Sequence, residues 1–423
     1  MQLYKYPQQA EWGKILMRPS LDSYLLEKSV RKILNDVKKN KDKAVKKYSK
    51  KFDGVSVRKL LVTDKEFQEA EALLGNELKQ AIKQAAANIR RFHEKQLTAP
   101  EIIETMTGVQ CWRKSVAIDK AGLYIPGGSA PLFSTVLMLS IPAVIAGCKE
   151  IALCTPPGKD GKIAAPVLFA AGLTGITKVF KAGGVQAIGA MVYGTESIPQ
   201  VYKIFGPGNQ YVTCAKQLVQ QDGIAIDMPA GPSEVAVYAD ETAKPAFVAA
   251  DLLSQAEHGA DSQVLLVTID ESCIAKVKDE IDRQLNKLPR KEIALKALEN
   301  SKIILVKNAD EAMDLLNEYA PEHLILSCNN ADAMAEKIIN AGSVFLGHYS
   351  PESVGDYASG TNHTLPTNGY AKAYSGVSVD SFVKKITYQK LTAEGLKNIG
   401  NTVIEMAEAE GLQAHAEAVR VRL

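Results

Sequence analysis

The sequence predicts an α/β protein built on parallel β-sheets, and three observations lead to this prediction. Short apolar runs alternate with stretches of helical periodicity from Gly122 to about residue 210, a pattern typical of strands joined by crossover helices. The alternation resumes over 235–346, which indicates a second unit of the same kind. Glycine-rich turns follow the strand-like runs of the first unit, where open parallel sheets commonly bind ligands. With 423 residues, the chain is long enough for two or three domains.

Each expected element of the two units can be placed by its residues. In the first unit the pattern predicts strands at 122–126, 151–154, 178–180 and 203–206, and helices at 131–147, 163–173 and 185–193. In the second unit it predicts strands at 235–239, 264–268, 303–306, 324–326 and 344–346, and a helix over 244–258. Beyond about residue 377 the chain is expected to be mostly helical.

Two long stretches before the first unit also have helical periodicity. Residues 22–53 carry apolar side chains at helical spacing among many lysines, and residues 64–96 look like another long helix. The lysines between Lys38 and Lys51 could form a polyanion site, although a solvated helix face is the more ordinary interpretation. Because these helices need a partner to bury their apolar faces, we expect them to share the second sheet.

Composition and charge argue against several classes of protein. The 50 Lys and Arg residues nearly balance the 48 Asp and Glu residues, so nothing indicates a nucleic-acid partner. The six cysteines are scattered without a CxxC motif, which favours free thiols in a reducing compartment over a disulfide framework. The first residues do not resemble a secretory signal, and no run approaches the ~20 apolar residues of a membrane span. We therefore expect a soluble cytoplasmic protein.

Glycine-rich turns follow strand-like runs of the first unit at 126–129 (PGGS), 183–184 (GG) and 206–209 (GPGN). Glycine lets the backbone approach a phosphate closely, and helix N-termini supply free N–H groups. Several such turns at one edge of a parallel sheet would make a nucleotide crevice. None fits the GxGxxG fingerprint, however, and no acidic residue stands at the distance expected for ribose recognition. The turns alone therefore leave nucleotide binding and ligand-free tight turns both open.

Histidines near amides and carboxylates are the sharper indication of chemistry. Gln255 and His258 stand three residues apart near the end of an expected helix, so both lie on one face, where they can begin a metal site. Glu322 and His323 stand at a strand entrance, and an adjacent carboxyl–imidazole pair suits acid–base work because His titrates near neutral pH. On spacing alone, each pair is more often an ordinary surface or strand-entrance feature.

Two further pairs lie nearer the C-terminus. Asp356 and His363 occupy a loop of small residues and turn formers, and Glu410 and His415 fall in the sequence EGLQAH. Ordinary turn chemistry and an exposed histidine remain the alternatives for these two pairs. Spacing cannot show that the four clusters converge. If they do, a ligand set of N and O atoms without thiolate would suit Zn²⁺, and also Mn²⁺ or Co²⁺.

Long and specific segments surround these clusters. They are GLYIPGGSAPLFSTVLML (122–139), FGPGN (205–209), DMPAGPSEV (227–235), DLLSQAEHG (251–259), PEHLI (321–325), AGSVFLG (341–347), SPESVGDYASGTNHTLPT (350–367) and EGLQAH (410–415). Through these segments the chain resembles the histidinol dehydrogenase family, from roughly residue 15 to 420. A chance match of this extent is not a serious alternative.

The resemblance implies a role for each matching residue. The positions that match the family's zinc ligands are Gln255, His258, Asp356 and His415. Glu322 and His323 match its catalytic acid–base pair. The substrate site implied by the resemblance comprises Ser233, Gln255, His258, His323, Asp356, His363, Glu410 and His415. The NAD-contacting positions are matched by Tyr124, Gln186 and Asn209.

The resemblance also implies a fold and an assembly. The fold is two Rossmann-like parallel-sheet domains of the aldehyde-dehydrogenase-like kind, plus a small helical C-terminal dimerisation segment. The implied parts are an N-terminal arm (1–21), a discontinuous substrate and metal domain (22–121 and 236–376), an incomplete Rossmann-like NAD-binding domain (122–235) and a dimer-swapped helical segment (377–423). In the implied homodimer, His415 reaches the site of the partner chain.

The implied activity is a zinc-dependent, four-electron oxidation of L-histidinol to L-histidine by two NAD⁺, through bound L-histidinaldehyde, at the last step of histidine biosynthesis. In it, His323 takes the hydroxyl proton and Glu322 activates water. One rival is an NAD-linked dehydrogenase of another alcohol or aldehyde on the same scaffold, and a second is a catalytically silent nucleotide- or metal-binding protein. The chain departs from the family pattern in an inserted loop at 158–162 and a shortened turn near 220–223, which touch none of the named residues.

Overall fold

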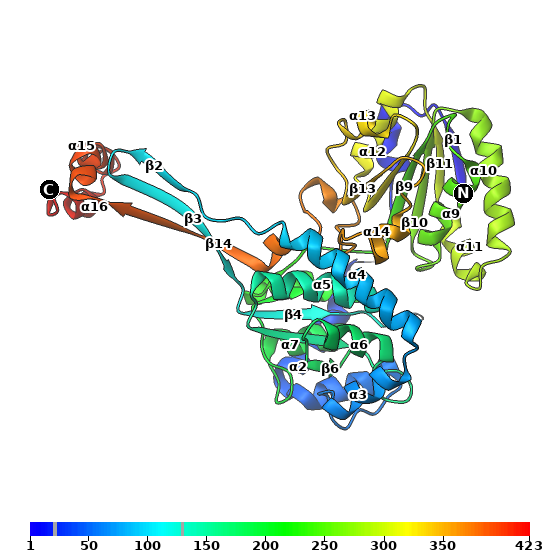
Figure 1. The fold of residues 1–423 in the computed structure, drawn as a ribbon, viewed down its shortest axis with the longest axis horizontal. Helices are drawn as coiled ribbons and strands as arrows, with labels where there is room; N and C mark the ends of the chain where they lie inside the picture. Colours follow the sequence, from blue (N-terminus) through cyan, green and yellow to red (C-terminus); the bar gives the residue numbers. More distant parts are fainter. Residues whose placement is uncertain (20–22, 128–130) are drawn as a thin grey trace.

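The structure is a computed structural model that describes residues 1–19, 23–127 and 131–423, so positions 128 and 129 of the first glycine-rich turn lie outside the described residues. The described residues form two lobes, each built on a parallel sheet, and a long arm that projects away from them (Figure 1). The prediction of an α/β fold with two parallel-sheet units is therefore confirmed.

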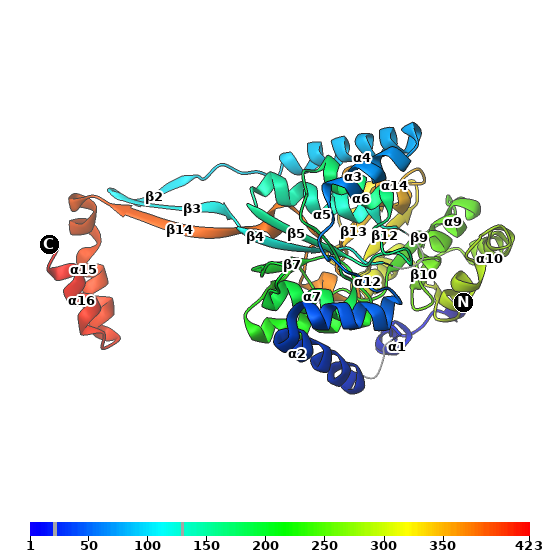
Figure 2. The ribbon, with the colours of Figure 1, turned by 90° about the horizontal axis from the view of Figure 1, so that it is seen from below.

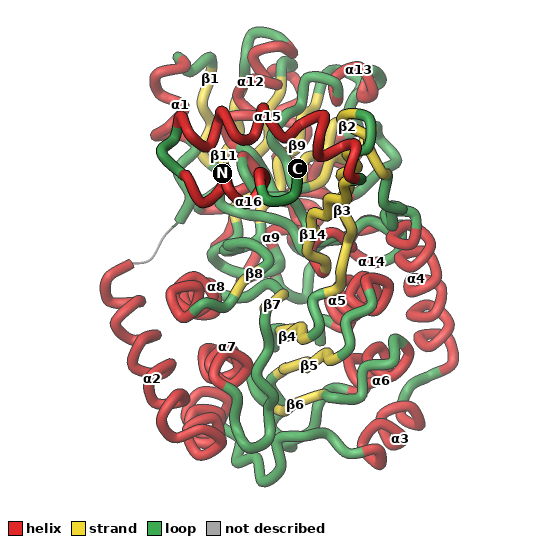
Figure 3. Tube along the Cα trace, turned by 90° about the vertical axis from the view of Figure 1, so that its left-hand side faces the viewer, coloured by secondary structure: helices red, strands yellow, loops and turns green. Residues whose placement is uncertain are grey.

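The first sheet consists of β4 (Lys120–Tyr124), β5 (Glu150–Thr155), β6 (Val179–Lys181), β7 (Lys203–Phe205) and β8 (Ala225–Ile226). Its order is β6-β5-β4-β7-β8, and its strand pairs are parallel. Side chains alternate between the two faces, so Leu123 enters one core and Tyr124 the other. The helices that cover these faces are α5 (Phe133–Ala146) and α6 (Ala165–Leu173) on the side of Leu123, and α7 (Gly184–Tyr193) and α8 (Gln210–Val219) on the side of Tyr124 (Figure 3).

The second sheet consists of β1 (Gln2–Lys5), β9 (Glu234–Ala239), β10 (Gln263–Thr268), β11 (Lys302–Leu305), β12 (His323–Ser327) and β13 (Ser343–Leu346). Its order is β1-β11-β10-β9-β12-β13, again in parallel. One face is covered by α9 (Pro245–Ala256), α10 (Glu271–Leu285) and α11 (Lys291–Glu299). The other face is covered by α1 (Gln9–Ile15), α12 (Ala309–Tyr319) and α13 (Ala331–Ala335). The inner strands are buried on both sides, which explains their nearly continuous apolar sequences.

The N-terminal helices do not pack where the sequence led us to expect. The helices are α2 (Ser23–Tyr48), α3 (Asp64–Leu73) and α4 (Asn76–Glu94), so the single helix expected over 64–96 is divided at Leu74 and Gly75. α2 packs on α7 and α8, α3 on α6, and α4 on α5, all of them on the first sheet. The prediction that these helices share the second sheet is therefore wrong. The expected domain boundary at residue 121 is wrong for the same reason, because it separates the helices from the first sheet, on which they pack. An apolar stripe shows that a helix needs a partner, but not which of two similar sheets supplies it.

The segment expected to be an N-terminal arm, residues 1–21, belongs instead to the second lobe over its described part. β1 pairs with β11, and α1 contributes Trp12 and Ile15 to the core beneath the second sheet. The chain then crosses to the first lobe through residues 20–22, which lie outside the described residues, and α2 follows.

The projecting arm is an antiparallel sheet of β2 (Ile102–Met106), β3 (Val109–Ala117) and β14 (Val383–Leu391), in the order β14-β3-β2. At its far end it carries α15 (Ala393–Ala409) and α16 (Gln413–Arg420) (Figures 1 and 2). The helical C-terminal segment is confirmed, but the strand at 383–391 was not predicted. Both faces of the arm are largely exposed, so its strands lack the buried alternation by which strands are found. None of the described helices is long and apolar enough to cross a membrane.

Candidate active site

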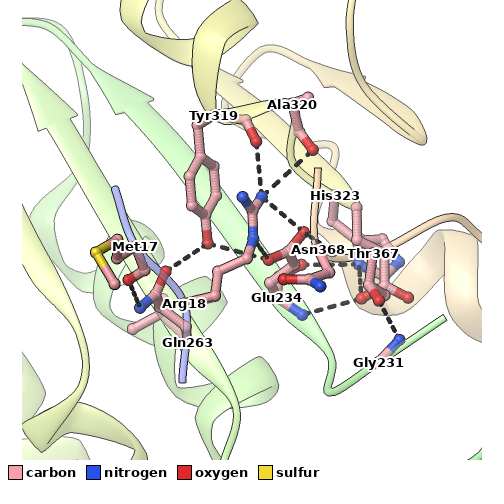
Figure 4. Close-up of polar contacts among 12 residues, drawn as sticks. Met17, Arg18, Gly231, Glu234, Gln263, Tyr319, Ala320, His323, Thr367 and Asn368 are labelled. Carbon is pink, nitrogen blue, oxygen red and sulfur yellow. Dashed lines mark hydrogen bonds and ion pairs between the residues drawn. The ribbon is translucent and has the colours of Figure 1, made fainter. Parts of the chain in front are cut away.

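The adjacent residues Glu322 and His323 lie where β12 begins. His323 lies beside Glu234, at the start of β9 (Figure 4). The backbone nitrogen of Glu234 donates to Glu322 Oε2 at 2.9 Å, and the backbone oxygen of Glu234 lies 3.3 Å from His323 Nδ1. A carbonyl oxygen can only accept, so this contact assigns the proton of a neutral ring to Nδ1. His323 Nε2 is therefore the nitrogen left free to take up a proton.

Burial and charge shift the proton affinities of this pair strongly. Burial raises the pKa of Glu322 to about 8, because desolvation disfavours the carboxylate. Burial alone would lower the pKa of His323, but the carboxylates of Glu322 and Glu352 outweigh it and raise that pKa to about 10. Large shifts in a buried carboxyl–imidazole pair are typical of acid–base sites.

Three potential metal ligands lie beside His323. A short helix, α14 (Glu352–Tyr357), presents Glu352 and Asp356 four residues apart on one face, and His258 lies just beyond the end of α9. One ligand atom from each of these three residues lies within 4.8 Å of the other two. Asp356 Oδ1 is also 3.3 Å from His323 Nε2. The structure thus brings the predicted residues His258 and Asp356 together with the acid–base pair.

Gln255, on α9, faces the same group. One atom of its side-chain amide lies 2.7 Å from Glu352 Oε1, and the other lies 3.1 Å from the backbone nitrogen of Glu234. Hydrogen bonding alone would turn the amide nitrogen toward Glu352, whereas a cation bound between the two side chains would turn the amide oxygen toward it.

Several buried polar atoms of this cluster have no hydrogen-bond partner within the described part of the chain. They are Asp356 Oδ1, Glu352 Oε2 and His323 Nε2. Buried polar atoms normally have partners. Amide and carboxylate oxygens beside imidazole nitrogens therefore fit a divalent cation with N and O ligands.

His363 links this cluster to the first lobe. Its Nδ1 lies 2.8 Å from the backbone oxygen of Asp356, and its Nε2 lies 3.0 Å from Thr135 Oγ1 on α5. Ser233 is half-buried and directly precedes Glu234. Both predicted residues therefore lie beside the groups described above, where the two lobes meet.

Two predicted residues lie elsewhere. Glu410, which directly follows α15, and His415, on α16, are exposed. Both helices lie at the far end of the arm, away from α9, α14 and β12 (Figure 1). Within a single chain, the four clusters singled out in the sequence therefore do not all converge. The long arm holds the last cluster in a position from which it can meet a second molecule.

A cavity of about 1230 Å³ opens at the first sheet and is lined by Tyr124, Gln186 and Asn209. The Tyr124 hydroxyl accepts from the backbone nitrogen of Gly184 at 3.0 Å, and Asn209 caps α8 by accepting from the nitrogens of Tyr211 and Val212. Both polar atoms of the Gln186 amide are buried and lack a partner among the described residues. An unpartnered amide in the wall of a cavity this large fits a sizeable polar ligand such as a nucleotide.

The turn at 206–209 is built around a close backbone approach. Gly206 has φ +126°, and a Cβ there would lie 2.0 Å from the backbone oxygen of Tyr124. Beneath the turn, Lys216 Nζ donates to the backbone oxygen of Gly206 at 2.8 Å, and the backbone nitrogen of Gly206 donates to Asp227 Oδ2 at 2.7 Å. This glycine is therefore required by the turn itself, whatever ligand the cavity holds.

Sequence reasoning missed three residues of this site: Glu352, Glu234 and Arg18. Glu352 had a signal, because it stands one helical turn before Asp356. Glu234 and Arg18, whose side chains form an ion pair, had none, because the two residues are 216 positions apart in the chain.

The fold and the site together define an α/β enzyme with a buried acid–base pair at one sheet and a nucleotide-sized cavity at the other. The sequence profile of histidinol dehydrogenase matches residues 16–423. The histidinol dehydrogenase of Bacteroides thetaiotaomicron is 62% identical over 423 residues, which cover 100% of this chain and 99% of the relative. The chloroplastic histidinol dehydrogenase of Arabidopsis thaliana is 52% identical over 409 residues, covering 96% of this chain and 87% of the relative.

Structural comparison agrees with the sequence comparison. The crystal structure of histidinol dehydrogenase from Elizabethkingia anophelis matches with a TM-score of 0.97 and 56% identity, covering 100% of this chain and 98% of the other. The chain belongs to the histidinol dehydrogenase family of oxidoreductases.

Proposed function

We propose that this protein oxidises L-histidinol to L-histidine in two NAD-dependent steps, the last step of histidine biosynthesis. Family membership supports the substrate and the product. The observation that carries the chemistry is the 3.3 Å approach of His323 Nε2 to Asp356 Oδ1. It puts a proton acceptor beside a set of metal-binding groups, and alcohol oxidation needs both a base and a means of fixing the alcohol carbon.

The donor set of Gln255, His258 and Asp356, with Glu352 beside it, fits Zn²⁺. When bound there, the ion would orient the substrate and offset the negative charge of the two carboxylates. L-Histidinol carries an imidazole and an amino group, and both are nitrogen ligands that such an ion accepts. A substrate held at two points presents its alcohol carbon in one orientation, which is the main benefit expected of the metal site.

The cavity of the first sheet fits NAD, which would supply the hydride acceptor. Its volume of about 1230 Å³ exceeds that of an ordinary small-ligand pocket. The unpartnered Gln186 amide, the capping residue Asn209 and the hydroxyl of Tyr124 supply polar groups along its wall. The family resemblance assigns these same three residues to NAD.

The two acid–base residues divide the proton transfers between them. The nearby carboxylates raise the pKa of His323, so the ring becomes a base only when a bound cation offsets their charge. His323 Nε2 then takes the hydroxyl proton as the first hydride leaves the alcohol carbon for NAD, which yields the aldehyde. Glu322 then takes a proton from water as the water oxygen bonds to the aldehyde carbon, and the proton taken up by His323 in the first step passes to the aldehyde oxygen, which gives the neutral hydrated aldehyde. Loss of a second hydride and a proton from this hydrated aldehyde gives the carboxylic acid, so four electrons leave the substrate and one oxygen enters it.

A homodimer with shared sites accounts for the arm. Apolar side chains on its strands, among them Ile102, Ile103 and Ile386, are exposed in the single chain, as are Met406 and Leu412 on the helices that it carries. Large exposed apolar surfaces mark interaction sites. We propose that the arm packs on a second copy and brings Glu410 and His415 to the partner's metal-binding cluster.

The test is NADH formation after addition of L-histidinol to the metal-loaded protein. Two NADH per L-histidine formed, lost on chelation and restored by Zn²⁺, is the expected result. NADH formation from another alcohol or aldehyde, with none from L-histidinol, would instead favour a different dehydrogenase on this scaffold.

A further inference from the structure

The guanidinium group of Arg18 lies between the carboxylate of Glu234 and the ring of Tyr319 (Figure 4). Its Nη2 donates to Glu234 Oε1 at 3.0 Å and to the backbone oxygen of Tyr319 at 2.6 Å, and its Nε donates to Glu234 Oε2. The guanidinium carbon lies 3.9 Å from the centre of the Tyr319 ring. A two-point contact with a carboxylate combined with stacking on a ring is available to arginine and not to lysine.

Several groups hold the side chain of Glu234 in place. Its carboxylate is buried and also accepts from the backbone nitrogen of Asn368 at 2.9 Å and from the Tyr319 hydroxyl at 3.2 Å. Arg18 supplies a full positive charge to this group, and a buried carboxylate deprived of its cation is strongly unfavourable.

The backbone of the same residue holds the acid–base pair. Its nitrogen donates to Glu322 Oε2, and its oxygen receives the Nδ1–H of His323. The first contact orients the carboxylate, and the second selects the ring tautomer that leaves Nε2 free. Any displacement of Glu234 therefore moves both groups.

We propose that Arg18 is a positioning residue of the reaction: through Glu234 it sets the orientation of Glu322 and the tautomer of His323. The inference rests on the proposed function of that pair. It gives a role to an N-terminal segment of the chain that contributes no group to the cluster itself.

The segment around Arg18 has a separate anchor, which allows a matched control. Lys302 Nζ and Gln263 Nε2 both donate to the backbone oxygen of Met17, at 2.9 and 3.2 Å. Lys302 is buried, Arg18 is partly buried, and Lys302 binds the residue adjacent to Arg18, but it has no contact with Glu234 among those found for the described residues. Lys302→Met therefore disturbs the same segment without disturbing the carboxylate.

The experiment compares Arg18→Met and Lys302→Met in steady-state oxidation of L-histidinol by the zinc-loaded protein. Misplacement of reacting groups by about 1 Å costs up to about 100-fold, so kcat of Arg18→Met should fall by about that factor. The KM for NAD should stay within about threefold, because the NAD cavity lies at the other sheet. Millimolar guanidinium should raise the kcat of Arg18→Met about tenfold, and a merely structural defect would not show this rescue. Lys302→Met should keep kcat within about threefold of the wild-type value.

If Arg18→Met does not fold, Arg18→Lys takes its place, with an expected loss of about tenfold in kcat and an unchanged KM for NAD. A kcat within about threefold of wild type in the folded Arg18 variant, or an equal loss in Lys302→Met, overturns the inference alone. An unaltered protein that forms no NADH from L-histidinol overturns the proposed function and this inference with it.

Discussion

Lys216 and Asp227 form an ion pair with an N–O distance of 2.5 Å, and their side chains are only 2% and 1% exposed. The pair lies beneath the glycine turn that borders the NAD-sized cavity, where each partner also binds the backbone of Gly206. Removing one member of such a pair leaves an uncompensated charge in the protein interior. Both the conformation of the turn and the stability of the first lobe should therefore depend on this ion pair.

We expect Lys216→Met to lower the free energy of unfolding by about 3–5 kcal/mol and to raise the KM for NAD. Urea denaturation and steady-state kinetics measure the two effects. Lys178→Met is the matched control, because Lys178 forms an exposed pair with Glu150 at 2.8 Å on the same sheet. That variant should lose no more than about 1 kcal/mol. Equal stability losses in the two variants would contradict the prediction.

The elements that could be predicted from the sequence are those whose burial leaves a pattern. The run VLLVT at 264–268 falls within β10, and VAVYA at 235–239 within β9, because strands covered on both faces are apolar throughout. β2 is exposed along its whole length, so it carries no such pattern. Its position depends on pairing with β3, and β3 pairs in turn with β14 from the other end of the chain.

The candidate site follows the same division. Local spacing placed Gln255 near His258, and Glu322 beside His323, because each pair lies within one element or at its end. Their convergence could not be predicted from spacing, since loops and sheet order bring α9, β12 and α14 together. The contact between Arg18 and Glu234 is longer-ranged still, and a single sequence contains no physical signal for it.

Metal binding should depend on Asp356, whose carboxylate lies in the cluster with His258 and Glu352. Asp356→Asn keeps the size of the side chain and removes its charge, so the purified variant should retain far less zinc than the wild type. Metal analysis of the purified proteins measures this. Asp240→Asn is the control, because Asp240 is also a buried carboxylate but follows the opposite end of β9. A normal zinc content in Asp356→Asn would count against the proposed ligand set.

Glu322 should matter more for the second oxidation than for the first. Glu322→Gln can still accept a hydrogen bond from the nitrogen of Glu234, but it cannot take a proton from water. General-base catalysis contributes about 10²–10⁴-fold, so oxidation of L-histidinaldehyde should slow by that order. Oxidation of L-histidinol to the aldehyde should slow much less. Single-turnover NADH formation from each substrate separates the two steps, and equal losses would contradict the role given to Glu322.

Sharing of sites between two chains can be tested by co-expressing two inactive variants. Gln255→Leu damages the cluster on the body of its own chain, whereas His415→Asn damages the exposed helix at the end of the arm. In a symmetric pair that exchanges arms, each mixed dimer has one undamaged site, so random assembly should restore about one quarter of the wild-type activity. Co-expression of Gln255→Leu with His258→Asn should restore none, because both changes fall on the body and every site is damaged. Activity in neither mixture would mean that each site is built from one chain, and the arm would then need another explanation. Activity that returned in the second mixture would mean that recovery does not depend on the exchange of arms, which would also contradict the prediction.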